Sequence, residues 1–535
     1  MSTRTQVFAT VDRGTASTAV ALIGRMGGRY RLLGSTGGPA GVPADALIER
    51  LRRSVAAADP ELAEALGIGQ AGIAPDLPRL VCSTARPPLL AVIAATERVV
   101  RPLAAIAETA GWQVRTLVLD GAEILKTAMD LSDRHVDAIL AGASEPPGAD
   151  ERTLIGELGT LVAAATERRP DLVTVLAGGL AAPSGKTEAL FRPDRPGPTV
   201  LAPSPTAHDG ESLRSLLDSL RGGEDDGRRA IGAATGSLAR VLRRRVEVLE
   251  IGQSGGSRTL ASWQPGGSPS VHTATVARAA LLPRPFAEAD LDAVIGWLPI
   301  SLDRLRTRDR LREMAIAPWG DAAGEGAILR MAAVRAATGR LLEMTPGFDV
   351  LPAPDLVVAS GGAWLAAPAT ATALAIADVA RRPGARAVGL DHARVLAPIG
   401  TIEDDEERAR LLADLRDDLL VPLGTIVTAA GLRGTRTLGT LTVHGGGSPL
   451  EMELVPGGVE LVDVPPGERA TIELRFREPV DLGVRARHIS LEVLGGLGGL
   501  VVDLRDVPLH LPERLEPRRE LLASWQAAVW PGFDQ

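Results

Sequence analysis

A strand–turn–strand unit occurs twice in this chain, and it limits the folds that the chain can adopt. Residues 7–23, VFATVDRGTASTAVALI, read as an apolar strand, a turn with a carboxylate and a glycine, and a second apolar strand. Residues 246–263, VEVLEIGQSGGSRTLASW, repeat the pattern about 240 residues later. Two related halves that each begin with a hairpin predict a duplicated α/β fold with a cleft between the halves.

The segments after each hairpin alternate between apolar strands and helical patterns, which favours parallel sheets with helices on their faces. From about residue 435, short strands separated by Gly and Pro turns replace this alternation, and a short helical pattern ends the chain. We therefore predict three domains. They are 1–240, a first half with an inserted α/β segment and a loop-rich connection; 241–434, a second half; and 435–535, a β-rich domain with a terminal helix.

Composition excludes several classes of protein. A net charge of -8 argues against a nucleic-acid-binding surface. Nearly all of the 58 basic residues are Arg, as in a GC-rich bacterial genome, and the single cysteine, Cys82, excludes an internal disulfide. The chain shows neither a secretory leader nor an apolar run of membrane-spanning length, so we expect a cytoplasmic protein. The sequence predicts no oligomeric state.

Three strand-to-turn sites combine glycine with carboxylate or hydroxyl groups. Glycine allows backbone N–H groups to approach a phosphate, and a carboxylate beside phosphates suits hydrated Mg²⁺. Each turn alone is more typical of an ordinary tight hairpin, since glycine is common in turns. Together they predict a nucleotide site. Its candidate residues are Asp12, Gly14 and Thr15 in the first turn, Glu250, Gly252, Gly255 and Gly256 in the second, and Gly361 and Gly362 in the third.

In this order the turns resemble those of the actin, sugar-kinase and Hsp70 ATPase superfamily. Within it, the chain resembles the MutL family that accompanies cobalamin-dependent glutamate mutase, which is unrelated to the mismatch-repair protein of the same name. The likeness is most specific in residues 354–402, from PDLVVASGGAWL to VLAPIGTI, and in residues 499–529, GLVVDLRDVPLHLPERLEPRRELLASWQAAV.

The resemblance implies actin-like, ribonuclease-H-like halves around a cleft and an accessory, chaperone-like role. ATP with Mg²⁺ would close the cleft, and closure would release a damaged cofactor from a cobalamin-dependent mutase or act on another protein partner. Cobalamin would be met only through that partner. The resemblance implies that Asp12 and Glu250 orient Mg²⁺ and water, with Asp12 as the metal ligand. Thr15 and the amides of the first two turns would hold phosphates, and the third turn would face the adenosine.

The chain departs from the family's pattern at the phosphate turns. Glu250 replaces an Asp, Ser257 stands where the family has a second Asp, and Arg13 places a bulky cation in the first turn. Residues 141–149, AGASEPPGA, correspond to an acidic, glycine-rich loop of the family. These departures leave two alternatives open: a pseudo-ATPase scaffold or interaction module with a degenerate nucleotide site, and a small-molecule kinase.

Two further features have competing interpretations. Gly185-Lys186-Thr187 follows a strand as in a P-loop, but Leu180 stands where that motif needs glycine, so we expect no nucleotide role for Lys186. Asp12 has a structural alternative as well. An ion pair with Arg13 would explain its place at the end of a strand without any ligand.

Overall fold

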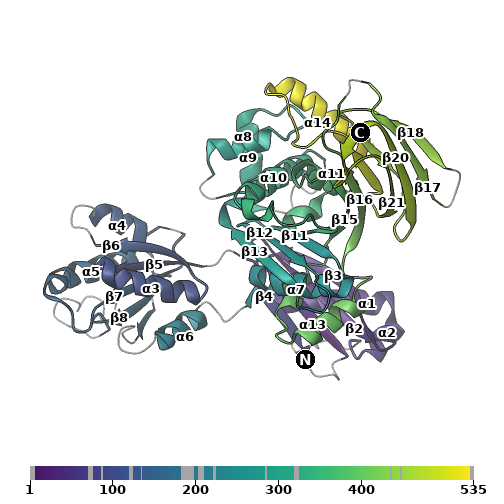
Figure 1. Ribbon diagram of the computed structural model, residues 1–535. Helices are drawn as coiled ribbons and strands as arrows, with labels where there is room; N and C mark the ends of the chain where they lie inside the picture. Colours follow the sequence, from purple (N-terminus) through teal and green to yellow (C-terminus); the bar gives the residue numbers. More distant parts are fainter. Residues whose placement is uncertain are drawn as a thin grey trace. The chain divides into compact units, whose positions relative to one another are not determined.

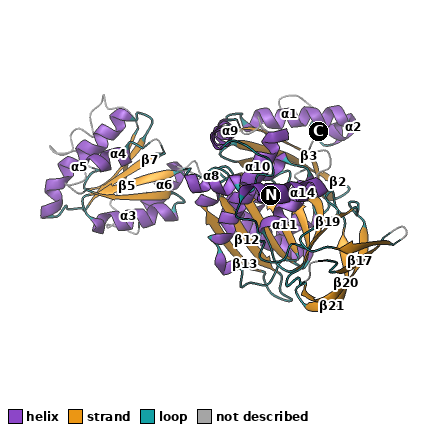
Figure 2. Cartoon of the chain, turned by 90° about the horizontal axis from the view of Figure 1, so that it is seen from above, coloured by secondary structure: helices purple, strands orange, loops and turns teal. Residues whose placement is uncertain are grey.

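The computed structural model describes residues 6–69, 76–85, 88–119, 124–133, 135–181, 198–202, 210–220, 225–283, 286–317, 324–433, 436–445 and 449–529. The chain forms two compact units (Figures 1 and 2). One contains Met1–Arg86 and Asp225–Gln535, and the other contains Pro87–Glu224.

The larger unit begins with a five-stranded sheet in the order β10-β4-β1-β2-β3. β1, β2 and β3 are antiparallel neighbours, whereas β4 and β10 continue the sheet in parallel on the other side of β1. Helix α1 (Ala44–Ala58), followed by α2 (Pro60–Ala65), packs on β2 and β3. The strands are β1 (Val7–Arg13), β2 (Ser17–Met26), β3 (Arg29–Pro39), β4 (Arg79–Ser83) and β10 (Asp225–Asp226).

The second sheet has eight strands in the order β13-β12-β11-β14-β15-β16-β22-β19. β11, β12 and β13 are again antiparallel, and β14 and β15 again follow β11 in parallel. The strands are β11 (Arg245–Ile251), β12 (Gly256–Ser262), β13 (Ser270–Val276), β14 (Leu356–Ser360), β15 (Gly384–Leu390), β16 (Val421–Thr428), β19 (Val459–Val462) and β22 (Leu500–Asp503).

The first five strands of the two sheets thus share one order and one set of directions. The hairpins at residues 7–23 and 246–263 hold equivalent places, because β1 pairs with β2 and β4 as β11 pairs with β12 and β14. This duplicated, ribonuclease-H-like arrangement is that of the actin-like ATPase fold. The predicted fold class, two related α/β halves with an additional β-rich C-terminal region, is confirmed.

Helices cover both faces of the second sheet. Helix α7 (Gly227–Leu242), with α12 (Leu396–Gly400) and α13 (Asp405–Asp414) beside it, packs between the two halves. Helices α10 (Gly324–Glu343) and α11 (Ala369–Val379) pack on the opposite face. Two further helices, α8 (Glu288–Ile295) and α9 (Arg304–Ile316), precede α10.

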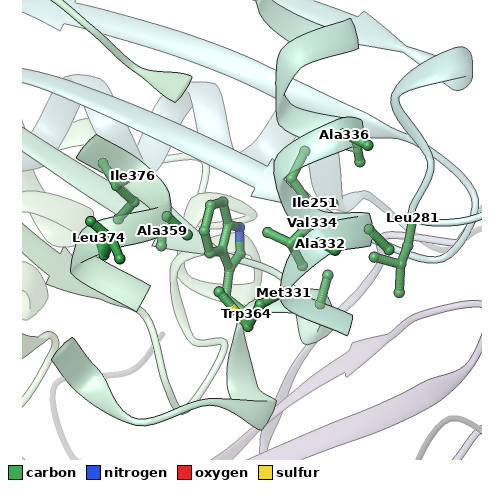
Figure 3. Close-up of a cluster of buried hydrophobic side chains, with 14 of the residues drawn as sticks. Ile251, Leu281, Met331, Ala332, Val334, Ala336, Ala359, Trp364, Leu374 and Ile376 are labelled. Atoms are coloured by element: carbon green, nitrogen blue, oxygen red, sulfur yellow. The ribbon is translucent and has the colours of Figure 1, made fainter. Parts of the chain in front are cut away.

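A large apolar core fills the α10 and α11 side of the second sheet. Trp364 lies at its centre, fully buried, among side chains from β11, β14, α10 and α11 (Figure 3). Trp364 belongs to η5 (Gly362–Ala366), the short helix directly after the third glycine turn. The core therefore fixes the position of that turn.

The C-terminal region continues the second half in part. β19 and β22 extend the eight-stranded sheet, and a separate four-stranded sheet has the order β18-β17-β20-β21. Its strands are β17 (Gly439–His444), β18 (Leu450–Leu454), β20 (Arg469–Asp481) and β21 (Arg485–Leu494). The terminal helix is α14 (Leu515–Val529), which packs against α11 and β19. A domain boundary near residue 435 stays a prediction.

The smaller unit is a parallel sheet in the order β6-β5-β7-β8-β9. Helices connect β5 to β6, β6 to β7 and β7 to β8, and a further helix follows β9. Its strands are β5 (Leu89–Ala94), β6 (Gln113–Val118), β7 (Ala138–Ala143), β8 (Val173–Gly178) and β9 (Thr199–Ala202). Its helices are α3 (Glu97–Thr109), α4 (Ile124–Leu131), α5 (Ala149–Arg168) and α6 (Glu211–Leu220). Apolar cores lie within it on both faces of the sheet. Across the described part of the whole chain, no helix is both long and apolar enough to cross a membrane.

Candidate functional site

Asp12 and Glu250 occupy equivalent positions, each one residue before the end of the first strand of its half. Side chains alternate between the faces of a strand, so Phe8 and Asp12 share one face of β1, as Val246, Val248 and Glu250 share one face of β11. Phe8, Val246 and Val248 belong to the apolar core between the halves. Each carboxylate therefore ends the row of side chains that faces the other half.

Asp12 is fully engaged by protein groups. Arg394 donates from Nε to Oδ2 at 2.8 Å, and its Nη2 lies 2.6 Å from the same oxygen. Thr84 donates from Oγ1 to Oδ1 at 2.7 Å. Asp12 is only 3% exposed and Arg394 only 5%. The structural alternative expected an ion pair with Arg13, whereas the structure shows an ion pair of Asp12 with Arg394, which comes from the other half of the fold.

Arg394 is held in an uncommon backbone conformation. It follows β15 with φ of 55°, in the left-handed region that costs a residue with a side chain roughly 1–2 kcal/mol. Its N–H donates to the carbonyl of Asp391 at 3.2 Å, and its Nη1 donates to Ser17 Oγ at 2.7 Å. The loop is thus shaped to direct this guanidinium into the first hairpin.

Glu250 has the mirrored arrangement. Arg228, in the first turn of α7, donates from Nε to Oε2 at 3.0 Å, and both side chains are buried. Ser257 Oγ lies 3.4 Å from the same oxygen. Burial raises the pKa of Glu250 above its ordinary value, although Arg228 favours the charged form.

The two ion pairs cross between the halves. Arg228 follows β10, the fifth strand of the first half, and holds the carboxylate of the second half. Arg394 follows β15, the fifth strand of the second half, and holds the carboxylate of the first half. The duplication of the fold therefore includes a reciprocal pair of buried ion pairs at the floor of the predicted cleft.

The hairpin turns satisfy their own backbone groups. Gly14 N–H donates to the carbonyl of Ser17 at 2.8 Å, and Gly252 N–H donates to the carbonyl of Gly255 at 2.9 Å. Thr15 Oγ1 donates to Ser254 Oγ at 2.8 Å, which joins the two turns directly. The amides predicted to hold phosphates at Gly14 and Gly252 are thus engaged within the turns.

The remaining predicted glycines pack closely on protein atoms. A Cβ atom at Gly256 would lie 2.8 Å from the carbonyl oxygen of Glu250, and one at Gly255 would lie 3.4 Å from Cζ of Arg228. At Gly361, with φ of 93°, a Cβ atom would lie 2.4 Å from the carbonyl oxygen of Ile251. At Gly362 it would lie 3.4 Å from Ser17 Oγ. The close approach of protein backbone explains Gly256 and Gly361 without a ligand.

The structure thus brings all three glycine turns to one place, but little space remains between them. The cavity there has a volume of about 40 Å³ and is lined by Thr15, Ser17, Glu250, Gly252, Gly362 and Arg394, among others. Ligand pockets measure roughly 300–1,000 Å³, whereas one water needs roughly 10–15 Å³. In this conformation the cavity has room for a few waters and is much smaller than a nucleotide pocket.

The donor set does not fit Mg·ATP in this arrangement. Mg²⁺ prefers oxygen ligands in octahedral geometry, and both oxygens of Asp12 already accept from Thr84 and Arg394. Within the described ranges, no group of three or more His, Cys, Asp or Glu side chains is placed to hold a metal ion. The nucleotide and metal roles of the predicted residues stay proposals.

Sequence reasoning missed Arg228, Arg394 and Asp391. Asp391 is buried behind the third turn, where it accepts from Ser360 Oγ at 3.0 Å and from the N–H of Val395 at 3.0 Å. Burial raises the pKa of Asp391 to about 6. A carboxylate directly after a buried apolar strand was a detectable signal in the sequence. Arg228 and Arg394 had no feature in the sequence that distinguished them from the many other arginines of the chain.

Two other predicted features are the loop at residues 141–149 and Lys186. The loop at residues 141–149 joins β7 to α5 in the unit Pro87–Glu224, where Ser144 N–H donates to Glu151 Oε1 at 2.8 Å. Lys186 lies outside the described residues. The prediction that Lys186 has no nucleotide role is therefore untested.

The strand order and the three converging turns define a protein of the actin-like ATPase fold. No family model and no curated protein matches the chain. Among solved structures it is similar to component A of (R)-2-hydroxyglutaryl-CoA dehydratase from Acidaminococcus fermentans, at 7% identity over 75% of this chain and 99% of that chain, with a TM-score of 0.25. It is similar to the PilM-PilN type IV pilus biogenesis complex at 13% identity over 76% and 96%, with a TM-score of 0.23.

The PPX-GPPA enzyme of Aquifex aeolicus is similar at 9% identity over 76% of this chain and 89% of that chain, with a TM-score of 0.19. These TM-scores are too low to support an assignment. The fold class therefore rests on the strand order of this chain itself.

Proposed function

We propose that this chain is an accessory protein of the actin-like ATPase fold that acts as a scaffold and does not turn over ATP. The observation that carries the proposal is the reciprocal pair of buried ion pairs, Arg394 with Asp12 and Arg228 with Glu250. They occupy the two positions at which the resemblance would place Mg²⁺ and its attacking water.

Energetics favour the scaffold over a nucleotide-driven machine. Separating one member of a buried ion pair from its partner costs roughly 3–5 kcal/mol. Mg·ATP would have to displace both arginines and also widen a cavity of about 40 Å³. An ATP-driven chaperone requires a second, open conformation that binds nucleotide better than this one. In such a state Arg228 and Arg394 would turn from the carboxylates to the phosphates.

Thermal melting with and without Mg·ATP separates these alternatives. A ligand at one hundred times its dissociation constant stabilises a protein by roughly 2.7 kcal/mol. A concentration of about 5 mM Mg·ATP would saturate a site with a micromolar dissociation constant. We expect that this concentration leaves the melting temperature unchanged and that phosphate release does not exceed that of a control without protein. A saturable rise in the melting temperature would support the ATP-driven alternative or a small-molecule kinase.

The partner that we propose to test first is a cobalamin-dependent mutase. Support comes only from the resemblance of residues 354–402 and 499–529 to the MutL family. Cobalamin would then contact the partner and not this chain. We expect the purified mutase and this protein to co-elute in gel filtration without added nucleotide. Failure to co-elute at micromolar concentrations, with or without Mg·ATP, would direct the search to another protein partner.

A further inference from the structure

A second cavity, of about 490 Å³, lies at the other end of the second sheet. The carboxyl ends of β11, β14 and β15 lie towards the three glycine turns; they carry Glu250, Ser360 and Leu390. Glu247, Val357 and Arg386, near the amino ends of the same strands, line this second cavity. It is therefore distinct from the three glycine turns.

Four arginines line this cavity, and three of them have evident partners. Arg258 donates to Glu247 at 2.7 Å and stacks over the ring of Phe348. Arg381 pairs with Asp503 at 2.6 Å. Arg382 donates to the carbonyl oxygens of Leu351, at 2.9 Å, and Phe348. Arg258 and Arg381 thus have carboxylate partners, and Arg382 is held by carbonyl oxygens, although Nε of Arg381 is buried without a hydrogen-bond partner among the described residues.

Arg386 is the exception. It is 5% exposed, and its described contacts are the carbonyl of Arg382 at 2.8 Å and Thr428 Oγ1 at 3.4 Å. Its Nε is buried without a hydrogen-bond partner among the described residues, and none of the ion pairs found there includes it. The carboxylates of Glu247 and Asp503 act on it through space but are held by other arginines.

A buried arginine without a counter-ion is uncommon, because the desolvated charge is costly unless it is paired. Burial lowers the pKa of Arg386 to about 10, so the side chain stays protonated at neutral pH. A planar guanidinium matches the oxygens of a carboxylate or phosphate. Apolar side chains, including Leu342, Leu351 and Val379, form another part of the wall.

We propose that this cavity binds a small oxyanion, a phosphate or the carboxylate of a short apolar acid, and that Arg386 is its counter-charge. Three carboxylates, Glu247, Asp349 and Asp481, also line the cavity, and the first two are paired with Arg258 and Arg382. The charge available to an anion is therefore that of Arg386, and the apolar wall accommodates a short carbon chain. The cavity volume suits a small molecule of this class. The inference does not depend on whether the cleft binds nucleotide.

Calorimetric titration of the full-length protein tests the proposal, with sodium phosphate and sodium hexanoate as separate probes at constant ionic strength. We expect saturable binding of at least one probe, with a melting temperature that rises with probe concentration. Binding of phosphate alone assigns an inorganic or esterified phosphate, and binding of hexanoate alone assigns an organic acid. Absence of saturable binding by both probes would overturn the proposal.

Variants connect the binding to the side chain. Arg386→Met should weaken the probe by at least ten-fold and raise the melting temperature of the ligand-free protein, because it removes an unpaired buried charge. Arg386→Lys keeps the charge without the planar fork and should bind with intermediate affinity. Arg312→Met, at an exposed arginine, is the matched control and should change neither. Undiminished probe affinity in Arg386→Met, or a lower ligand-free melting temperature, would contradict the proposal.

Discussion

Arg394 extends from the second half of the fold to Asp12 in the first, with Nη2 2.6 Å from Oδ2 of the carboxylate. Arg228 makes the reciprocal contact from the first half to Glu250 in the second. Both ion pairs are buried, and both join an element after a fifth strand to the hairpin of the other half. The two halves are therefore joined by buried ion pairs at the residues that the sequence analysis predicted to hold Mg²⁺ and water.

The contact between Arg228 and Glu250 gives the first prediction. Arg228→Met leaves Glu250 buried without a counter-ion, so the free energy of unfolding at pH 7.5 should fall by about 3–5 kcal/mol. Adding Glu250→Gln should restore most of that loss, because the unpaired charge is removed. Arg101→Met, which breaks an exposed pair with Glu97, should cost less than about 0.5 kcal/mol. Urea denaturation measures all of these, and an equal loss in the single and double variants would contradict the ion-pair account.

Asp391 predicts a specific dependence of stability on pH. Burial raises the pKa of Asp391 from 3.8 to about 6. The folded state therefore binds its proton more tightly than the unfolded state, and this contribution to stability is present below about pH 4 and lost as the pH rises through 6. Two pKa units correspond to about 3 kcal/mol. The free energy of unfolding of Asp391→Asn, relative to that of wild type, should consequently rise as the pH is raised from 4.5 to 7.5.

Asp355 is the control for that measurement. Burial alone would raise the pKa of Asp355, but hydrogen bonds from Arg245 outweigh it, and the pKa is lowered. Its contribution to stability is present above its ordinary pKa of 3.8 and is lost only in more acidic solution. The stability of Asp355→Asn relative to wild type should stay flat between pH 4.5 and 7.5. A flat profile for Asp391→Asn as well would show that Asp391 titrates normally.

Gly361 tests whether the third turn is shaped by protein packing. Gly361→Ala meets both a φ of 93° and a contact of 2.4 Å with the carbonyl oxygen of Ile251. Gly266→Ala meets only a φ of 73°, because nothing lies within 4 Å of the added Cβ atom. The conformational term alone is about 1–2 kcal/mol, so Gly266→Ala should lose that amount and Gly361→Ala clearly more. Equal losses in thermal or urea melts would show that the turn relaxes around the added methyl group.

The division of the chain into compact units gives a further prediction. The cores of Pro87–Glu224 lie within that segment, and β10 pairs with β4 so that Asp225 lies beside Cys82. Replacing residues 87–224 with a short Gly-Ser linker should therefore leave a folded protein with a cooperative melt. The excised segment should also melt cooperatively. Loss of the cooperative transition in the shortened protein would show that the segment is needed for folding.

The sequence allowed the duplicated fold to be predicted because continuous apolar strands and a repeated hairpin are local patterns. Asp12 and Glu250 were predicted as site residues because each carboxylate stands at the turn of one of these hairpins. The partners of these carboxylates were not predictable, since Asp12 and Arg394 are 382 residues apart and the chain contains many arginines. Gly361 read as a ligand-facing glycine, whereas its conformation and its approach to Ile251 account for it without a ligand.

The melting temperatures of wild type, Asp12→Asn, Arg394→Met and the double variant, each with and without Mg·ATP, test the central claim most directly. We predict that Asp12→Asn lowers the ligand-free melting temperature sharply, that adding Arg394→Met recovers much of the loss, and that Mg·ATP changes none of the four values. The coupling between the two sites should be about 1–3 kcal/mol. The account is contradicted if Mg·ATP stabilises the wild type and Asp12→Asn removes that gain while leaving the ligand-free melting temperature unchanged.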